Sequence, residues 1–464
     1  MLRKALKILA YFILAILILL VVLLKPVDFT PYFETDYYTE TQLRYDSLTQ
    51  SIRTENGAVS IGLSKVNLTP TLHGDSNDAA SGKFIGIPLS GYGGREDVAQ
   101  GVHDSIYVKS VALKVGNRTL VIVGSDLLIM PPDVSKKVSE RAKTELGLDR
   151  SDLLLSATHT HSSIGAWSEG YIGESFNGPY NPDATDWIAQ QVFESISLAI
   201  QDLKPGSIGM GSLPISHFMR NRLVGEKGKI DPDFMLIQLQ QKDGKKALIG
   251  SYNAHATTLG GSNLEVSGDY PGYWQRKVEE SDFDLAIFLA GSVGSHSYRN
   301  AEGEEFEKTK YLGEALADSV QAYLPTIWMK DSISVRSMTL EIDLPEFQFR
   351  ITDGLRLRPF WAKKLFPDVG TVYLQATRLD SLVWGTTPSD FSGETTIGYK
   401  HTAGAKDMQA MVTSFNGAYT GYIIPCKYHH LEGYEPRLMN WFGPSYNSMI
   451  NDLMGTMLEE IAEP

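Results

Sequence analysis

The chain has 464 residues, of which 42% are apolar and 21% charged, a composition that excludes a disordered, collagen-like or disulfide-scaffold protein. Its formal net charge is −13, and residues 1–25 hold four basic and no acidic groups, so the remainder carries 38 basic against 55 acidic residues. Such an acidic body argues against nucleic-acid binding, which needs clustered Lys and Arg to contact phosphates. Cys426 is the single cysteine, which excludes an internal disulfide and a Cys-based zinc site.

The N-terminal segment predicts a membrane anchor. Residues 8–24 are seventeen apolar residues without a charge, flanked by Lys7 and Lys25, and as a helix they span roughly 25 Å, close to a bilayer core. The basic flank predicts a cytoplasmic N-terminus and an extracytoplasmic body, periplasmic or extracellular. A cleaved signal peptide is the alternative, but its apolar region usually has about 7–15 residues and ends at a small-x-small site, which is missing here. We therefore predict a signal anchor over residues 1–26.

The rest of the chain predicts a polar stalk over residues 27–57 and one large catalytic domain over residues 58–464. Apolar or alternating segments predict strands at residues 105–115, 119–129, 152–158, 234–240, 247–254, 285–291, 334–344 and 371–377. Helical patterns occur at residues 132–146, 184–203, 271–280, 309–324 and 445–461. Because strands and helices alternate only in part, the pattern predicts an α/β fold of mixed β-sheets flanked by helices. Residues 344–370, which mix basic and aromatic groups, are expected to form a surface connector, with a lid as the alternative.

Three histidines at strand ends are the clearest candidates for chemistry. Thr158-His159-Thr160-His161 ends the predicted strand 152–158, and because alternate side chains share a face of a strand, His159 and His161 should point the same way. His255 likewise ends an apolar strand before a Gly-rich loop, and active sites of α/β proteins gather at such strand ends. From spacing alone, surface histidines beside turns remain an equal alternative to a metal or catalytic site.

Taken together, the motifs resemble the neutral/alkaline (non-lysosomal) ceramidase family, zinc amidohydrolases that release the fatty acid from an N-acyl sphingoid base. The resemblance covers roughly residues 58–455. The matching segments are SGYGGRE, GVHDSIYVKSVAL, LVIVGSDLLIM, LLLSATHTHSSIG, NAHATTLGGSN, SGDYPGYW and SFNGAYTGYIIPCKYHHLEGYEPRLMNWFGP. The last segment keeps the family's N-x-x-Y-x-x-Y and Y-E…FGP pattern. The chain ends soon after it, so the resemblance extends to the N-terminal catalytic domain and leaves out the C-terminal accessory domain of long members.

The resemblance implies a zinc ion held by His159, His255, Asp390 and Tyr422. Asp390 lies in Pro388-Ser389-Asp390-Phe391, where the family has P-G-E-F, so its carboxylate is one methylene shorter. Zinc accepts Asp and Glu oxygens alike. Without the resemblance, Asp390 would be interpreted as a turn residue and Tyr422 as a strand aromatic.

The resemblance also implies catalytic roles for His161, Arg222 and Tyr434. His161 matches the histidine that contacts substrate and handles protons, Arg222 falls on the N-R motif that contacts the scissile group, and Tyr434 matches the tyrosine that faces the oxyanion. A turn histidine, a surface salt-bridge arginine and a core tyrosine are the corresponding structural alternatives.

A fourth catalytic candidate, Ser297, lies where the sequence departs from the family. The family has N-x-G-D-x-S-P, whereas residues 292–298 read SVGSHSY, so the Gly and Ser remain and the Asn, Asp and Pro are missing. A serine nucleophile needs an adjacent base, and His296 would point to the opposite face of an extended strand. We therefore predict that Ser297 is a hydrogen-bond donor or pocket residue, with a covalent nucleophile as the alternative.

The sequence thus predicts a membrane-anchored, zinc-dependent amidohydrolase that cleaves the N-acyl amide bond of ceramide or a similar lipid. Its partners would be a lipid substrate and the membrane that the N-terminal helix enters. A zinc hydrolase of the same fold acting on another amide or ester is the first alternative. The second is a surface lipid-binding protein whose catalytic segment has decayed.

Overall fold

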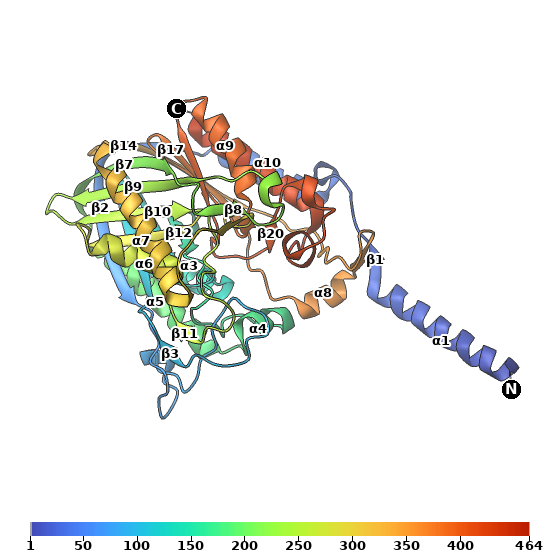
Figure 1. Ribbon diagram of the computed structural model, residues 1–464. Helices are drawn as coiled ribbons and strands as arrows, with labels where there is room; N and C mark the ends of the chain where they lie inside the picture. The colour runs from blue at the N-terminus through green and yellow to red at the C-terminus, as the bar shows by residue number, and fades with distance from the viewer. Residues whose placement is uncertain (1, 464) are drawn as a thin grey trace.

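A twelve-stranded sheet that branches at its longest strand organises the fold (Figure 1). The computed structural model describes residues 2–463. The branch point is β2 (Thr54–Asn67), which pairs with β4, β7 and β14. One arm contains β4 (Tyr107–Val115), β5 (Arg118–Ser125) and β6 (Leu153–Ala157). The second contains β7 (Lys204–Pro214), β9 (Asp233–Gln241), β10 (Lys246–Tyr252) and β12 (Leu285–Ala290). The third contains β14 (Ser332–Glu341), β16 (Tyr373–Leu379), β17 (Leu382–Thr386) and β19 (Gln409–Thr413).

The sheet is mixed, as the sequence predicts. β6 is parallel to β5, β12 to β10 and β19 to β17, whereas the other pairs in this sheet are antiparallel. Each parallel pair places the carboxyl ends of two strands at one edge. Loops that leave these edges can therefore meet.

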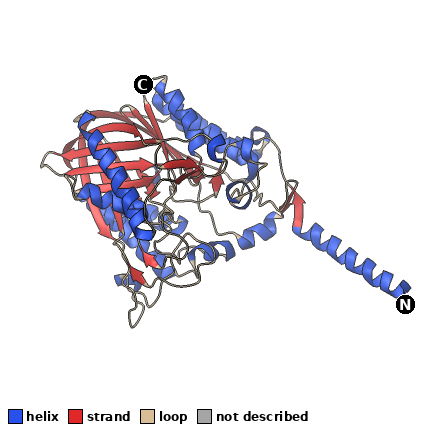
Figure 2. Cartoon of the chain, in the orientation of Figure 1, coloured by secondary structure: helices blue, strands red, loops and turns tan. Residues whose placement is uncertain are grey.

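Helices cover the outer faces of the three arms, and an apolar core lies between the arms (Figure 2). The helices are α3 (Pro132–Arg141) and α5 (Pro182–Gln201) on the first arm, α6 (Asp269–Glu279) and α7 (Glu305–Tyr323) on the second, and α9 (Gly393–Gly404) and α10 (Gly443–Ala462) on the third. In α10, Ile450, Met454, Met457 and Ile461 recur at helical spacing and are all buried, so an amphipathic stripe fixes this helix on the sheet. The predicted α/β fold of mixed sheets flanked by helices is confirmed.

Short elements complete the fold around the edge where the candidate site lies. They are β3 (Gly101–Val102), α4 (Tyr171–Asn177), β8 (Met219–Asn221), β11 (Glu265–Val266), β13 (His296–Tyr298), β18 (Asp390–Phe391) and β20 (Tyr422–Ile423). Three two-stranded pairs, β8–β13, β18–β20 and β3–β11, hold loops that follow the main strands.

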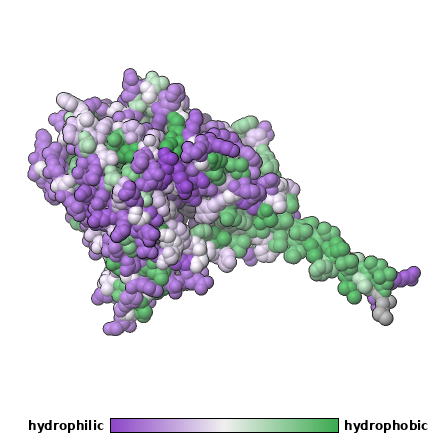
Figure 3. Space-filling model, in the orientation of Figure 1, coloured by the Kyte–Doolittle hydropathy of each residue, from purple (hydrophilic) through white to green (hydrophobic). Residues whose placement is uncertain are grey.

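The N-terminal apolar segment is the helix α1 (Leu2–Leu23), which projects from the body and has no buried residue (Figures 1 and 3). Its mean hydropathy over 18 residues is 3.0. These properties fit a membrane span, and an N-terminal signal sequence meets the same criteria.

The segment predicted as a polar stalk carries a helix that packs on the body. In α2 (Asp36–Thr49), Thr41 and Tyr45 are buried, and the hydroxyl of Thr41 accepts a hydrogen bond from the backbone N–H of Asp343 at 3.2 Å. The tyrosines of this segment make it look polar in sequence, yet their rings pack against the third arm. β2 also begins at Thr54, before the predicted start of the domain. The division into anchor, stalk and catalytic domain stays a prediction.

The excursion predicted at residues 344–370 joins β14 to β16 and contains two short elements, β15 (Leu355–Leu357) and α8 (Pro359–Leu365). β15 pairs antiparallel with β1 (Leu24–Pro26), which follows α1 directly. The excursion is therefore attached to the end of the N-terminal helix.

Candidate active site

The candidate site forms where loops leave the carboxyl ends of parallel strands in all three arms. His159 follows β6 by two residues, His255 follows β10 by three, and Asp390 follows β17 by four. Asp390 and Tyr422 are direct partners in the parallel β18–β20 pair. Residues far apart in the sequence are brought together because these strand ends lie at one edge.

The two histidines of the Thr-His-Thr-His motif do meet, but the predicted reason is wrong. β6 ends at Ala157, and His159 has a positive φ of 64°, so strand alternation does not operate here. A non-glycine residue in the left-handed region is uncommon and often marks a functional loop. This turn brings the Nε2 atoms of His159 and His161 to 3.4 Å from each other.

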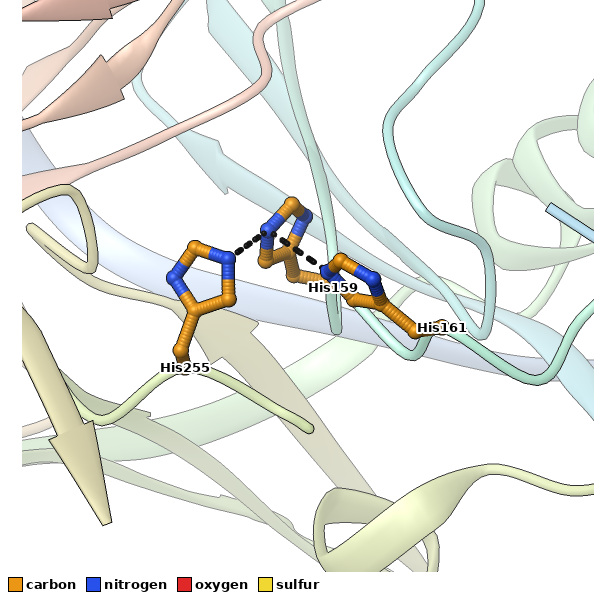
Figure 4. Close-up of side chains that lie close together, drawn as sticks. All are labelled: His159, His161 and His255. Carbon is orange, nitrogen blue, oxygen red and sulfur yellow. Dashed lines mark hydrogen bonds between the residues drawn. The ribbon is translucent and has the colours of Figure 1, made fainter. Parts of the chain in front are cut away.

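Three imidazole nitrogens converge in this loop cluster (Figure 4). The Nε2 atom of His159 lies 2.8 Å from that of His255 and 3.4 Å from that of His161. The second nitrogen of each ring fixes its orientation, because Nδ1 lies within hydrogen-bonding distance of a backbone carbonyl. These carbonyls belong to Leu128 for His159 at 2.7 Å, Gly91 for His161 at 3.0 Å and Val293 for His255 at 3.3 Å.

In neutral rings, Nδ1–H donates to these carbonyls and Nε2 carries a lone pair. Burial lowers the pKa of His159 to about 3 and that of His255 well below its usual value, so the rings are neutral near pH 7. Two nitrogen lone pairs 2.8 Å apart repel each other and cannot form a hydrogen bond. The arrangement therefore fits a cation at the point where the three Nε2 atoms converge.

A carboxylate and a phenol stand beside the histidines. Oδ1 of Asp390 is buried, has no hydrogen-bond partner among residues 2–463 and lies 3.4 Å from Nε2 of His159 and 3.9 Å from that of His255. The other oxygen, Oδ2, accepts a hydrogen bond from the Tyr419 hydroxyl at 2.7 Å. The Tyr422 hydroxyl lies 3.4 Å from Nε2 of His255. Burial raises the pKa of Asp390 to about 7, and a nearby cation would lower it again by stabilising the charged carboxylate.

This donor set fits a metal ion and in particular zinc, which accepts imidazole nitrogen and carboxylate oxygen. The four predicted ligands, His159, His255, Asp390 and Tyr422, all contribute an atom to the cluster. His161, predicted to handle protons, is within reach of the same ion, because the three imidazole donors lie within 4.8 Å of one another. Which of them bind the metal stays a prediction.

Two cavities of different polarity meet at the histidines. The first contains His159 and Asp390 and has a largely apolar wall formed by Leu128, Ile129, Trp167, Phe176, Met439 and Trp441. The second, here called the polar cavity, is wider and more polar than the first, because Arg220, Arg222, Ser297, Arg299 and Asn300 lie in its wall beside aromatic side chains. Six residues line both cavities: Gly91, His161, Phe176, His255, Tyr422 and Tyr434.

Arg222 and Tyr434, predicted to contact the reacting group, lie at the same junction. Nε of Arg222 pairs with Glu435 at 2.5 Å, and its guanidinium lies 5.8 Å from the centre of the Tyr422 ring. Tyr434 packs edge-on against Tyr422, with ring centres 5.7 Å apart. Burial raises the pKa of Tyr434, so it stays a protonated phenol that can donate a hydrogen bond.

Ser297 lies on β13 at the wall of the polar cavity, where its hydroxyl accepts a hydrogen bond from Nε of Arg220 at 3.0 Å. His296 is fully buried, and its ring nitrogens face the backbone N–H of Asp231 and the carbonyl of Ser292. The neighbouring histidine is thus turned away from Ser297 and cannot act as its base. This supports the prediction of a pocket residue over that of a nucleophile.

Sequence reasoning missed three residues that shape the site. The Tyr419 hydroxyl donates a hydrogen bond to Asp390. Tyr419 could have been found from the sequence, because it is the first tyrosine of the N-x-x-Y-x-x-Y pattern. The Phe415 ring stacks on His159 with centres 4.3 Å apart. Gly91 has a φ of 109°, and a Cβ there would lie 2.6 Å from the His161 ring, so only glycine lets the histidine approach this loop so closely. Phe415 and Gly91 both lie in segments that match the family, but the match gave neither residue a role.

The sequence is similar to those of known proteins. The sequence model of the family described as neutral/alkaline non-lysosomal ceramidase, N-terminal, matches residues 73–287. The neutral ceramidase of Pseudomonas aeruginosa is 24% identical over 302 residues, which is 58% of this chain and 42% of that protein. The neutral ceramidase of Oryza sativa subsp. japonica is 24% identical over 46% of this chain and 29% of that protein. The chain thus spans less than half the length of these relatives.

The fold is also shared with a solved structure. The crystal structure of neutral ceramidase from Pseudomonas aeruginosa superposes with a TM-score of 0.71 at 20% identity and covers 88% of this chain and 75% of that chain. At this identity the superposition establishes the fold.

Proposed function

We propose that this chain is a zinc-dependent amidohydrolase of the neutral/alkaline, non-lysosomal ceramidase family, whose N-terminal sequence model matches residues 73–287. Its substrate would be ceramide or a similar lipid in which a fatty acid is joined to an amine through an amide bond. The observation that supports this most strongly is the convergence of three imidazole Nε2 lone pairs with an unpaired carboxylate oxygen between an apolar and a polar cavity.

The proposed roles follow from the positions of the side chains. His159, His255, Asp390 and Tyr422 would hold the metal, which when bound supplies Lewis-acid polarisation of the amide carbonyl and lowers the pKa of water. Tyr434 would donate a hydrogen bond to the oxygen that becomes negative as the carbonyl is attacked. His161, at the junction of the cavities, would pass a proton to the leaving amine. Glu435 would fix the Arg222 guanidinium beside the scissile group.

The apolar cavity would take the acyl chain. Its wall of Leu, Ile, Trp, Phe and Met side chains offers hydrocarbon no hydrogen bonds to satisfy. Burying methylene groups there contributes roughly 0.8 kcal/mol each. Substrates with longer acyl chains should therefore have a lower KM until the cavity is filled.

The test is a substrate panel on the full chain purified in detergent micelles. We expect hydrolysis of labelled ceramide or another N-acyl lipid amide, loss of that activity with a chelator, and its return when zinc is added. Acyl esters with the same chain serve as the comparison for bond type. Hydrolysis that is equally fast with and without chelator would contradict the proposal, as would cleavage of esters alone.

Ser297→Ala provides a prediction about the attacking group. We expect the variant to keep its metal and to lose on the order of 10²–10³ in kcat, the size of one lost oxyanion donor. Metal analysis and steady-state kinetics check this. An acyl-enzyme on Ser297 in the wild type, detected as a mass increase equal to the acyl group, would contradict the assignment.

A specific observation favours a second candidate substrate, an N-acyl amide whose amine side carries an acidic group. The polar cavity presents three arginines in a chain whose net charge is −13. Arg220 has no carboxylate within 4.0 Å in the described part of the chain, and Arg299 has only the fully exposed Glu226 at 3.8 Å. Carboxylates and phosphates are the groups that arginine binds best.

Arg220→Gln and Arg299→Gln test this candidate. We expect each to raise KM roughly threefold to tenfold for an amide with a carboxylate or phosphate on the amine side, the range of a partly exposed ion pair. KM for the uncharged amide with the same acyl chain should stay the same. Lys143→Gln, which removes a 72% exposed cation on another surface, is the matched control. Equal effects on charged and uncharged amides would leave ceramide-like neutral lipids as the substrate.

A further inference from the structure

The end of helix α1 is attached to the excursion between β14 and β16. The last turn of a helix leaves backbone carbonyls without partners inside the helix. Here the backbone N–H of Arg358 donates to the carbonyl of Leu23 at 2.8 Å, and its Nε donates to that of Val21 at 2.8 Å. The Trp361 indole N–H donates to the carbonyl of Val22 at 3.1 Å. The body thus caps the N-terminal helix.

The attachment continues past the helix. β1 pairs with β15 over three residues, with Leu24 opposite Leu357. The fully buried Arg356 donates from Nε to the carbonyl of Pro26 at 3.2 Å and from a terminal nitrogen to that of Phe347 at 2.6 Å. Lys25 also pairs with Glu346 at 3.2 Å. A flexible tether would make none of these bonds, so the direction of α1 is fixed relative to the body.

Beside this junction, the surface of the body is apolar and basic. In α8, Phe360 is 61% and Leu365 37% exposed, whereas Ala362 is buried, and Lys363 and Lys364 follow. On the same excursion, Ile351 is 49% exposed. Figure 3 shows that the hydrophobic surface of α1 continues onto the adjoining face of the body. Exposed aromatic and aliphatic side chains next to lysines are typical of protein segments in the headgroup region of a bilayer.

The same excursion reaches the apolar cavity. Pro367 and Asp368, which follow α8 by two and three residues, line that cavity. The helix α4 contacts α8 and contributes Ile172 and Phe176 to the cavity wall. α8 therefore lies between the end of α1 and the cavity that contains His159.

We propose that α8 and the neighbouring residue Ile351, here called the membrane seat, lie in the headgroup layer of the bilayer that α1 enters. Because the C-terminal end of α1 is hydrogen-bonded to the excursion, insertion of α1 into a bilayer brings the seat to the membrane surface. The cavity beside the seat then faces the membrane, and a lipid can enter it from the bilayer without crossing water. The second part of this inference rests on the proposed function, whereas the position of the seat does not.

Spin labelling of the full chain in vesicles tests the position of the seat. In a Cys426→Ser background, one label replaces Phe360 and, in a second protein, Trp328, which is 80% exposed and lies in the segment between α7 and β14. The label of β14 in Figure 1 lies on the side of the body away from α1. The vesicles contain phosphatidylcholine and phosphatidylglycerol. We expect the label at position 360 to collide more with oxygen than with a water-soluble nickel chelate, and the label at position 328 to show the reverse. Equal access of the nickel chelate to both labels would overturn the proposal, as would removal of α1 from the mature chain.

A kinetic measurement tests whether substrate enters through the seat. The double variant F360E/L365E should raise KM at least tenfold for a long-chain amide in vesicles and leave KM for a short-chain, water-soluble amide unchanged. The substitutions are on exposed side chains, so the fold should persist. An equal KM for the vesicle substrate in wild type and variant would overturn entry from the membrane. Failure of the wild type to cleave either amide would count against the proposed function and leave the spin-label result standing.

Discussion

His159→Ala should abolish metal binding and activity together. His159 lies at the centre of the cluster, where its Nε2 is within 3.4 Å of nitrogen or oxygen atoms of His161, His255 and Asp390. A catalytic metal site with three or four protein ligands seldom survives the loss of one. We expect the variant to have no more activity than wild type treated with a chelator. Elemental analysis and steady-state hydrolysis of the N-acyl substrate measure the two effects on the same preparation.

The control for this variant is His401→Ala, which removes an exposed histidine from α9 and should change neither property. Because the ring of His159 packs on Phe415, the alanine also leaves a cavity and lowers stability. Thermal unfolding separates the loss of stability from the loss of metal. Zinc should raise the Tm of wild type, since a ligand that binds only the folded state stabilises it. Zinc should leave the Tm of a folded His159→Ala variant unchanged. A variant that unfolds cooperatively, binds zinc and turns over substrate would contradict the assignment.

His161→Ala should keep the metal and lose rate. The ring lies at the junction of the two cavities, and Nδ1 lies 3.0 Å from the Gly91 carbonyl, so Nε2 is the ring nitrogen that faces the site. Loss of a general acid costs typically 10²–10⁴ in kcat. We expect that range with KM little changed, together with a zinc content equal to that of wild type.

Tyr92→Phe is the matched control for His161. The Tyr92 ring packs against the histidine with centres 4.9 Å apart, while its hydroxyl donates to the carbonyl of Leu259 at 2.6 Å. The phenylalanine keeps the ring that positions His161, so kcat should stay within a few-fold of wild type. If His161→Ala instead loses zinc as His159→Ala does, His161 is a metal ligand and not the proton donor.

The sequence predicted the parts of the site that depend on local pattern. Apolar strands that end in Gly-rich or Ser-rich loops placed His159 and His255 at strand ends, and the motif resemblance then placed Asp390 and Tyr422 with them. The direct β18–β20 pairing of Asp390 with Tyr422 agrees with that expectation. The missing glutamate is replaced by an aspartate whose Oδ1 still reaches the histidines.

What could not be predicted depends on long-range contacts or on unusual backbone geometry. Nothing in the sequence announces a φ of 64° at His159, which replaces strand alternation as the reason that two histidines meet. The packing of α2 on the third arm could not be predicted, because the sequence does not show that the Tyr45 ring is buried. The bonds from Arg358 and Trp361 to α1 join residues more than three hundred positions apart. Local periodicity carries no information about such pairs.

Elemental analysis of the full-length wild-type protein tests the central claim most directly. After expression in zinc-supplied medium and purification without chelator, the account predicts about one zinc per chain, as expected for a single site of three or four protein ligands. The zinc should be lost in His159→Ala and retained in His401→Ala. A wild-type protein that contains no metal and still hydrolyses the amide would contradict the account.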